Sequence, residues 1–501
     1  MPFCMKCLQC VPQRWIIAVM GFFAFFNAYT LRVCLSIAVT QMVVLRNDTN
    51  KESLDETCPE FGENPLKNTT ITAAVRSGGT FEWSEYTQGI ILSSFYWGYV
   101  ITHIPGGLLA HKVGPKYTLG FGILITAILT VITPTAIQWG DAQALIAVRF
   151  LMGLCEGVIQ PAMSCLLSQW IPPQERSVIG SSVYVGIRFG IVISSVISGL
   201  IMDQSSGNWP SIFHLFGAIG IVWFVFWMFL AYNSPREHPF ITEKEKSYLN
   251  VHMSSHTHEN PAPFPWKRAL TSRPFLALIV MQSGQDWCSY TIMSDLPKYM
   301  HSVLKLPVYL NGYASSMHQI GSWLFCMLMS WLSDWLVAKD RATITTVRKM
   351  NTAISSLGPG CLLVAAMYAG CNVAAAITLI TIGLTLTGSA VPGIKVNVLD
   401  LSPNYAGTLM GISNGIGAVT GVLAPYTVGV LATNQTLSEW RLIFWIVAGV
   451  SLATTLNFLF NASGEVQDWN DPTVRKNKKT KKADAEEDVN LLTIKKNNEP
   501  K

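Results

Sequence analysis

Long apolar runs alternate with short polar segments along most of the chain. Each run is long enough for an α-helix to cross a bilayer core of ~30 Å, which takes about 20 residues. No alternation of apolar and polar residues over about ten positions, as in barrel strands, is visible. The pattern predicts an all-α membrane protein with twelve transmembrane helices, at residues 15–44, 86–110, 117–137, 142–170, 177–202, 211–232, 274–300, 310–336, 350–370, 373–399, 405–432 and 440–461.

The composition supports a chain that faces lipid. Only 13% of the residues are charged, whereas about 25% is usual in a soluble domain. The net charge of +5 is spread over short loops and a tail, so nucleic acid is not expected as a partner. The polar segments hold no nucleophile–base pair, phosphate loop or metal-spaced cluster. We therefore expect neither an enzyme nor a bound cofactor.

The distribution of Lys and Arg predicts the orientation in the membrane. The loops near 138–143, 203–210 and 370–373 contain neither residue type, and the loop 45–85 has eight acidic against four basic residues. The loops on the other side are basic, and the tail adds RKNKKTKK; the loop residues are Lys112, Lys116, Lys339, Arg341, Arg348 and Lys349. Both termini are therefore expected to be cytosolic.

An internal repeat divides the chain. Five proline and glycine residues recur at an offset of 231 positions: Pro161, Pro172, Gly180, Gly186 and Gly190 return as Pro392, Pro403, Gly411, Gly417 and Gly421. Two parallel six-helix halves are the plan of major facilitator transporters. The expected parts are a cytosolic N-terminus (1–14), a first bundle (15–232, with the outer loop 45–85), a cytosolic linker (233–273), a second bundle (274–461) and a disordered cytosolic tail (462–501).

Three segments carry a closer resemblance. They read SSFYWGYVITHIPGGLLAHKVGPK, RFLMGLCEGVIQPAMSCLLSQWIPPQERS and VNVLDLSPNYAGTLMGISNGIGAVTGVLAP. They are similar to the anion/cation symporters of the major facilitator superfamily, a family that includes sialin and the vesicular glutamate and sodium/phosphate cotransporters. Insect sialin-like and inorganic phosphate cotransporters resemble the chain most. The resemblance implies transport of a small anion driven by H⁺ or Na⁺.

The chain departs from that family at several positions. The loop after the second span has His111 where an acid is usual, although Lys112 and Lys116 are kept, and Asp334 marks the equivalent loop of the second half. These loops are expected to take part in gating. Leu92 and Gln285 stand where glutamate transporters have His and Arg, which argues against glutamate as the anion.

Six charged residues lie deep within the predicted spans, at bilayer depth, where each costs about 2.5–3.5 kcal/mol on insertion scales. They must face a cavity or a partner; they are Arg32, Arg149, Glu156, Arg188, Asp286 and Lys395. Arg32 lies 12 residues, or about 18 Å, before the end of its run, too far to reach the interface easily. Its planar fork of donors suits a carboxylate or a phosphate, and the resemblance also implies anion binding there.

Arg149 and Glu156 lie seven residues apart on one helix face. We expect Glu156 to couple transport to a cation by pairing with Arg149 when ionised and releasing it when protonated; a permanent structural pair is the alternative. Arg188 is expected to bind the anion or to pair with Asp286, itself a candidate coupling residue. Lys395 is expected to reach the membrane interface.

The remaining candidates are polar or lie in loops and the tail. Asn397 and Asn414 are possible lining residues of the pathway or structural helix contacts. Sequons at Asn47, Asn68 and Asn434 are candidate glycosylation sites. Glu487, Leu491 and Leu492 match an acidic dileucine signal read by sorting adaptors. The expected location is the plasma membrane or an endosomal or lysosomal membrane.

Three function classes follow. The first is a cation-coupled symporter of inorganic phosphate or an organic carboxylate such as a sugar acid. The second is a channel-like anion conductance on the same fold. The third is a membrane receptor without transport, which would need no buried charges.

Overall fold

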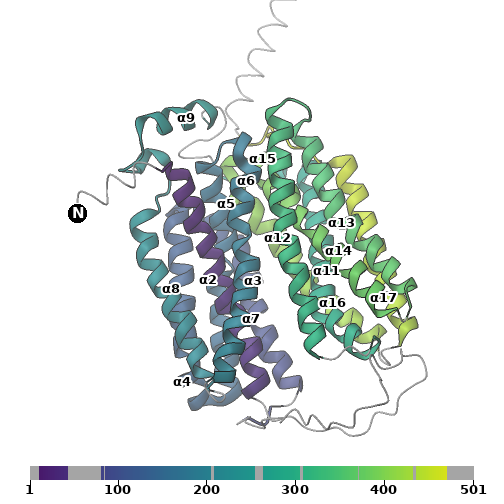
Figure 1. The fold of residues 1–501 in the computed structure, drawn as a ribbon. Coiled ribbons are helices and arrows are strands. Elements are labelled where there is room, and N and C mark those ends of the chain that lie inside the picture. Colours follow the sequence, from purple (N-terminus) through teal and green to yellow (C-terminus); the bar gives the residue numbers. More distant parts are fainter. Residues whose placement is uncertain are drawn as a thin grey trace, which may run out of the picture.

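The described residues form two helical bundles that lie side by side (Figure 1). The computed structural model describes residues 11–42, 81–83, 85–204, 208–253, 263–304, 308–370, 372–432 and 436–470. The candidate glycosylation sites Asn47, Asn68 and Asn434 lie outside these ranges, as do the tail residues Glu487, Leu491 and Leu492.

The first bundle contains six membrane-length segments. Its helices are α2 (Gln13–Met42), α3 (Glu85–Val113), α4 (Pro115–Glu156), α5 (Ile159–Trp170), α6 (Arg176–Tyr184), α7 (Gly186–Gln204) and α8 (Pro210–Leu230), with a short turn η1 (Pro173–Glu175) before α6. The long α4 bends at Gly140 and Asp141, which leave helical geometry, so α4 contributes two spans. Asp141 has a φ of 47° and accepts a hydrogen bond of 2.8 Å from the indole of Trp83.

The linker and the second bundle follow. The linker holds η2 (Pro235–Glu237), α9 (Glu243–Met253) and α10 (Trp266–Leu270). The second bundle holds α11 (Arg273–Ser302), α12 (Val308–Ala338), α13 (Ile344–Tyr368), α14 (Val373–Leu386), η3 (Thr387–Ser389), η4 (Val391–Lys395), α15 (Val396–Leu401), η5 (Pro403–Tyr405), α16 (Ala406–Leu431) and α17 (Leu437–Asn461). We call the end of the bundles where α9 lies the linker end (Figure 1).

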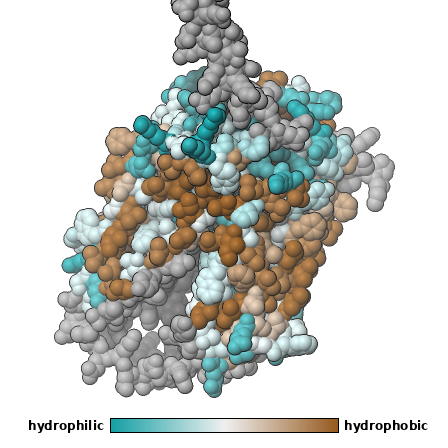
Figure 2. Space-filling model, turned by 180° about the vertical axis from the view of Figure 1, so that it is seen from behind, coloured by the Kyte–Doolittle hydropathy of each residue, from teal (hydrophilic) through white to brown (hydrophobic). Residues whose placement is uncertain are grey.

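The outer helices have surfaces suited to lipid. Within the described residues, eight helical stretches are long and apolar enough to cross a membrane, and one of them, 115–170, contains two of the expected spans. The remaining expected spans fall on α3, α11 and α16, which have 29, 30 and 26 residues. Apolar side chains cover much of the surface between more polar ends (Figure 2). On α12 an exposed apolar stripe follows helical spacing, with Met317, Ile320, Leu324, Leu328 and Trp331.

The repeated glycines mark the same helix contact in both halves. A Cβ at Gly186 of α7 would overlap the carbonyl oxygen of Phe22 on α2. A Cβ at Gly417 of α16 would likewise overlap the carboxylate of Asp286 on α11. Small residues allow such close approach between membrane helices. The prediction of two parallel six-helix halves is therefore confirmed by equivalent helix pairs.

One predicted boundary was wrong. The ninth span was expected at 350–370, which left Arg348 in a loop. In the structure α13 begins at Ile344, where the hydroxyl of Thr343 caps the helix by accepting a bond of 3.2 Å from the amide of Thr346. Arg348 therefore lies in the second turn of α13, and only 3% of its surface is exposed.

Candidate functional site

Arg32 and Glu156 form an ion pair inside the first bundle. Both Nε and Nη2 of Arg32 lie 3.2 Å from Oε2 of Glu156. The exposed fractions of the two side chains are 12% and 1%, so the pair is largely removed from solvent and from lipid. The other carboxylate oxygen of Glu156, Oε1, is buried and has no hydrogen-bond partner among the described residues. A buried acceptor without a hydrogen bond costs about 1–3 kcal/mol. Such an acceptor would be unusual in an ion pair that serves only to stabilise the fold.

Two glycines beside Glu156 bring α3 against the ion pair. A Cβ at Gly153 would overlap the carbonyl oxygen of Phe95, and one at Gly157 would lie 2.6 Å from that of Tyr99. The close approach places aromatic rings around the guanidinium of Arg32. Its Cζ lies 4.4 Å from the ring centre of Phe95 and 4.5 Å from that of Tyr99. Aromatic faces stabilise a desolvated cation by about 2 kcal/mol, so these rings help to hold the guanidinium of Arg32 in place.

Arg149 lies next to this pair but does not bind Glu156. Its Nη2 donates a hydrogen bond of 2.9 Å to the carbonyl oxygen of Arg32, and its Cζ lies 5.7 Å from the ring centre of Phe95. Among the described residues no ion pair joins Arg149 to Glu156. The prediction that Arg149 pairs with this acid was therefore wrong. The guanidinium of Arg149 bonds the backbone of α2, and the side chain that bonds the carboxylate of Glu156 is that of Arg32. The carboxylate of Glu156 therefore pairs with Arg32, and Arg149 is bonded beside it to a neutral acceptor.

A neutral bridge connects this centre to the second bundle. Tyr29 stacks below Arg32, with the guanidinium carbon 4.7 Å from its ring centre, and its hydroxyl accepts a bond of 3.4 Å from Nε2 of Gln160. Oε1 of Gln160 accepts from Nδ2 of Asn414 on α16. Oδ1 of Asn414 accepts in turn from Nζ of Lys395, at 2.7 Å. The bridge therefore joins two cations, one in each half.

The expected position of Lys395 at the membrane interface was wrong. Its ammonium points to Asn414 inside the protein because Lys395 ends the π-helical turn η4, which widens the helix at this point. Such π turns occur frequently at functional sites.

Arg188 and Asp286 take separate partners. Arg188 on α7 donates through Nη1 to Oε1 of Gln319 on α12 at 2.8 Å, a contact between the two halves. The carboxylate of Asp286 packs against Gly417 instead. No ion pair joins Arg188 and Asp286 in the part of the chain that the structure describes. Asn397 on α15 is fully buried, and neither polar atom of its side chain has a hydrogen-bond partner among the described residues.

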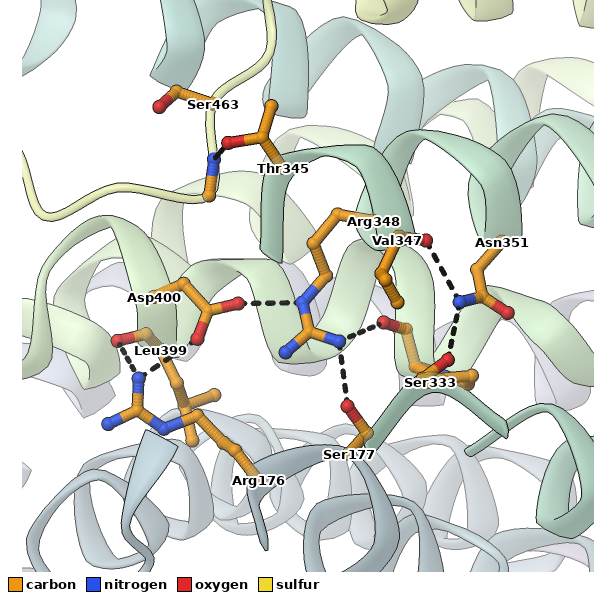
Figure 3. A network of polar contacts seen from close by, with 12 residues as sticks. Arg176, Ser177, Ser333, Thr345, Val347, Arg348, Asn351, Leu399, Asp400 and Ser463 are labelled. Carbon is orange, nitrogen blue, oxygen red and sulfur yellow. Dashed lines mark hydrogen bonds and ion pairs between the residues drawn. The ribbon is translucent and has the colours of Figure 1, made fainter. Parts of the chain in front are cut away.

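A second charged cluster lies between the two halves near the linker end (Figure 3). Arg176 at the start of α6 donates to Oδ1 of Asp400 at 2.9 Å, and Arg348 donates through Nε to Oδ2 of the same carboxylate at 2.7 Å. Arg348 also donates to the hydroxyl of Ser177 at 2.8 Å. All three charged side chains are at most 4% exposed. We call Arg176, Ser177, Arg348 and Asp400 the linker-end cluster; it ties the first half to the second.

No sequence pattern singled out this cluster, although its charged residues border the expected spans. Arg176 and Asp400 each lie one residue outside an expected span, so neither was counted among the charged residues of the spans. Of the predicted gating residues, Asp334 is next to the cluster and accepts a bond of 2.8 Å from the amide of Val178. Lys116 instead contacts the ring of Tyr232 at 4.4 Å, and Lys112 is exposed at the end of α3.

Two helical bundles joined across their interface by charged and polar side chains match the plan of a membrane transporter built from two halves. The sequence model of the Major Facilitator Superfamily matches residues 17–425. The chain belongs to this superfamily, among its anion/cation symporters, and is a transporter rather than an enzyme.

Individual proteins agree with this assignment. The chain is 37% identical over 470 residues to a "Putative inorganic phosphate cotransporter" of Drosophila melanogaster, covering 93% of this chain and 87% of that one. It is 38% identical over 460 residues to sialin of Homo sapiens, covering 92% and 91%. The solved structure of the proton:xylose symporter XylE shares the fold, with a TM-score of 0.68 at 12% identity over 90% of this chain and 97% of that one.

Proposed function

We propose that the protein carries a small anion by alternating access, coupled to the movement of a cation. The single observation that carries this proposal is the charge imbalance around Glu156: Arg32 bonds its carboxylate, and a second guanidinium, that of Arg149, bonds only the backbone carbonyl of Arg32. An anion would supply the missing negative charge. Inorganic phosphate and organic carboxylates such as sugar acids both suit the forked donors of arginine.

Glu156 is the proposed coupling residue. When ionised it occupies Arg32, and when neutralised by a proton it leaves Arg32 for the anion. This competition supports coupled transport, because a cation and the substrate would then enter and leave together. Sodium is the alternative coupling ion, and Asp286 with Asn397 are its candidate oxygen donors.

The linker-end cluster is the proposed cytosolic gate. It holds the two halves together at the end that the basic loops predict to be cytosolic. Opening would break the contacts of Arg176 and Arg348 across the halves and expose the site to the cytosol. Both termini would lie on that side, and the tail residues would be accessible to sorting adaptors. The membrane would be the plasma membrane or an endosomal or lysosomal membrane.

Flux into proteoliposomes tests the proposal. Purified protein is reconstituted, and uptake of phosphate, glucuronate and lactate is measured under an imposed proton or sodium gradient. We expect accumulation of at least one anion above its equilibrium level with only one of the two gradients. Flux that follows the anion's own gradient alone would indicate a channel, and the absence of any flux would indicate a receptor.

A further inference from the structure

Lys395 is a half-buried cation that the transport mechanism above does not use. It lies six residues before the end of α15 at Leu401, about 9 Å from the linker end of its helix. A lysine at this depth can reach the interface with its long side chain. Its ammonium instead bonds Oδ1 of Asn414 at 2.7 Å.

The immediate partner of this ammonium carries no charge. An amide oxygen compensates a buried ammonium less well than a carboxylate does, because hydrogen bonds between two charged groups are roughly twice as strong. Asp286 is the acid within electrostatic range of Lys395, but no ion pair joins the two among the described residues. Lys395 is therefore held in place by a neutral amide while its charge is only partly compensated.

The neutral bridge also fixes where a ligand would touch Lys395. Asn414 bonds Gln160 of the first half, and Gln160 bonds Tyr29, on which Arg32 stacks. Every link between Arg32 and Lys395 is thus an amide or a phenol. Hydroxyl groups of a ligand can replace each of these bonds, since amides both donate and accept.

We propose that Lys395 is the contact of the second half for the transported anion, and that this anion has two polar ends. Its carboxylate binds Arg32, and its hydroxyls or a second acidic group displace the Asn414–Gln160 bond and bind Lys395. Of the anions proposed above, this role of Lys395 favours carboxylates that carry hydroxyl groups over inorganic phosphate. A compact tetrahedral anion leaves Lys395 on Asn414, because the bridge separates the two cations. This inference rests on the proposed function.

Kinetics of two probes test the role of Lys395. Uptake of D-glucuronate and of inorganic phosphate is measured in proteoliposomes with wild type, Lys395→Met and Lys395→Arg, and with Lys339→Met as a control on an exposed lysine. We expect Lys395→Met to raise KM for glucuronate about tenfold or more, because a hydrogen bond to a charged group is lost. Its KM for phosphate should change less than about threefold. Lys395→Arg should restore most of the affinity for glucuronate, and Lys339→Met should match wild type.

Three outcomes would overturn the inference. An unchanged KM for glucuronate in Lys395→Met shows that Lys395 does not touch the ligand. An equal fall of kcat for both anions without a change in KM shows a structural role. Phosphate uptake by wild type without glucuronate uptake excludes the ligand class and leaves the proposed function intact. If wild type carries no anion at all, the proposed function fails and takes the inference with it.

A second readout guards against misfolding. Addition of glucuronate should raise the thermal unfolding midpoint of wild type and of Lys395→Arg, because a ligand that binds only the folded state stabilises it. Lys395→Met should unfold cooperatively and show no such rise at the same concentration. A full rise in Lys395→Met contradicts the proposal even if its transport is impaired.

Discussion

Replacing Asp400 with Asn should loosen the contact between the halves at the linker end. Asp400 is 2% exposed and accepts from Arg176 of the first half and from Arg348 of the second. Asparagine keeps the shape of the side chain and removes its charge. Two guanidiniums would then lie buried without their shared carboxylate, a situation that costs about 3–5 kcal/mol when a buried pair is broken.

Only part of that cost distinguishes the closed arrangement from the open one. The bond from Arg176 to Asp400 crosses between the halves, whereas the bond from Arg348 stays within the second half. A charged hydrogen bond contributes about 1.5–3 kcal/mol net. We therefore expect Asp400→Asn to disfavour closure by about 2–3 kcal/mol, which is about a 30- to 140-fold larger open population.

The rate of cysteine labelling measures that population. Thr408 is fully buried at the crossing of α16 and α3, where a Cβ on Gly107 would lie 2.8 Å from the Cα of Thr408. A Thr408→Cys variant can react with a water-soluble maleimide only when the linker end opens. The labelling rate should rise about 30-fold or more when Asp400→Asn is added, after subtraction of labelling in the protein without Thr408→Cys.

A neighbouring charge change provides the control. Glu175 pairs with Arg14 at 2.9 Å and accepts from Tyr248, both on the side of the first bundle. Glu175→Gln therefore removes a similar charge without touching a contact between the halves, and its labelling rate should match that of the parent. Equal rates in the Asp400→Asn and Glu175→Gln proteins would refute the assignment of the linker-end cluster as a gate.

Three further predictions concern coupling, packing and pH. Glu156→Gln should abolish gradient-driven accumulation while keeping anion counterflow, measured in proteoliposomes; retained accumulation would exclude Glu156 as the coupling residue. Gly186→Leu should prevent α7 from packing on Phe22 and reduce the yield of monodisperse protein in size-exclusion chromatography, whereas a normal yield would contradict that contact. Burial against Trp170 lowers the pKa of His238 from 6.5 to about 4. The folded state thus prefers neutral His238, and the stability that this provides is present above pH 6.5 and is lost as the pH falls toward 4. The unfolding midpoint of His238→Gln should fall less steeply than that of wild type across this window, and equal slopes would argue against the buried neutral imidazole.

The sequence was sufficient to predict the two halves, because membrane spans and repeated glycines are local signals. Span length follows from bilayer thickness, and the glycines at 186 and 417 each meet a neighbouring helix. The sequence also predicted that Arg32 faces away from lipid, since a charge at that depth requires a partner. None of these inferences depends on knowing which side chains meet across helices.

The pairing of the buried charges was not predictable in the same way. Helix spacing placed Arg149 and Glu156 on one face, but the carboxylate turns to Arg32 on another helix. The prediction for Lys395 was wrong because the orientation of its side chain depends on the π-helical turn η4, which no sequence pattern indicates. Prediction of the linker-end cluster would have required the correct start of α13. This helix begins six residues earlier than expected, which places Arg348 inside the protein rather than in a loop.

Uptake by Arg32→Ala tests most directly whether the buried guanidinium serves the transported anion. Wild type and variant are reconstituted at equal protein content, and concentrative uptake of phosphate and glucuronate is measured under the gradient that drives wild type. The account predicts that Arg32→Ala falls to the level of empty liposomes while its thermal unfolding stays cooperative. Full uptake by Arg32→Ala would contradict it.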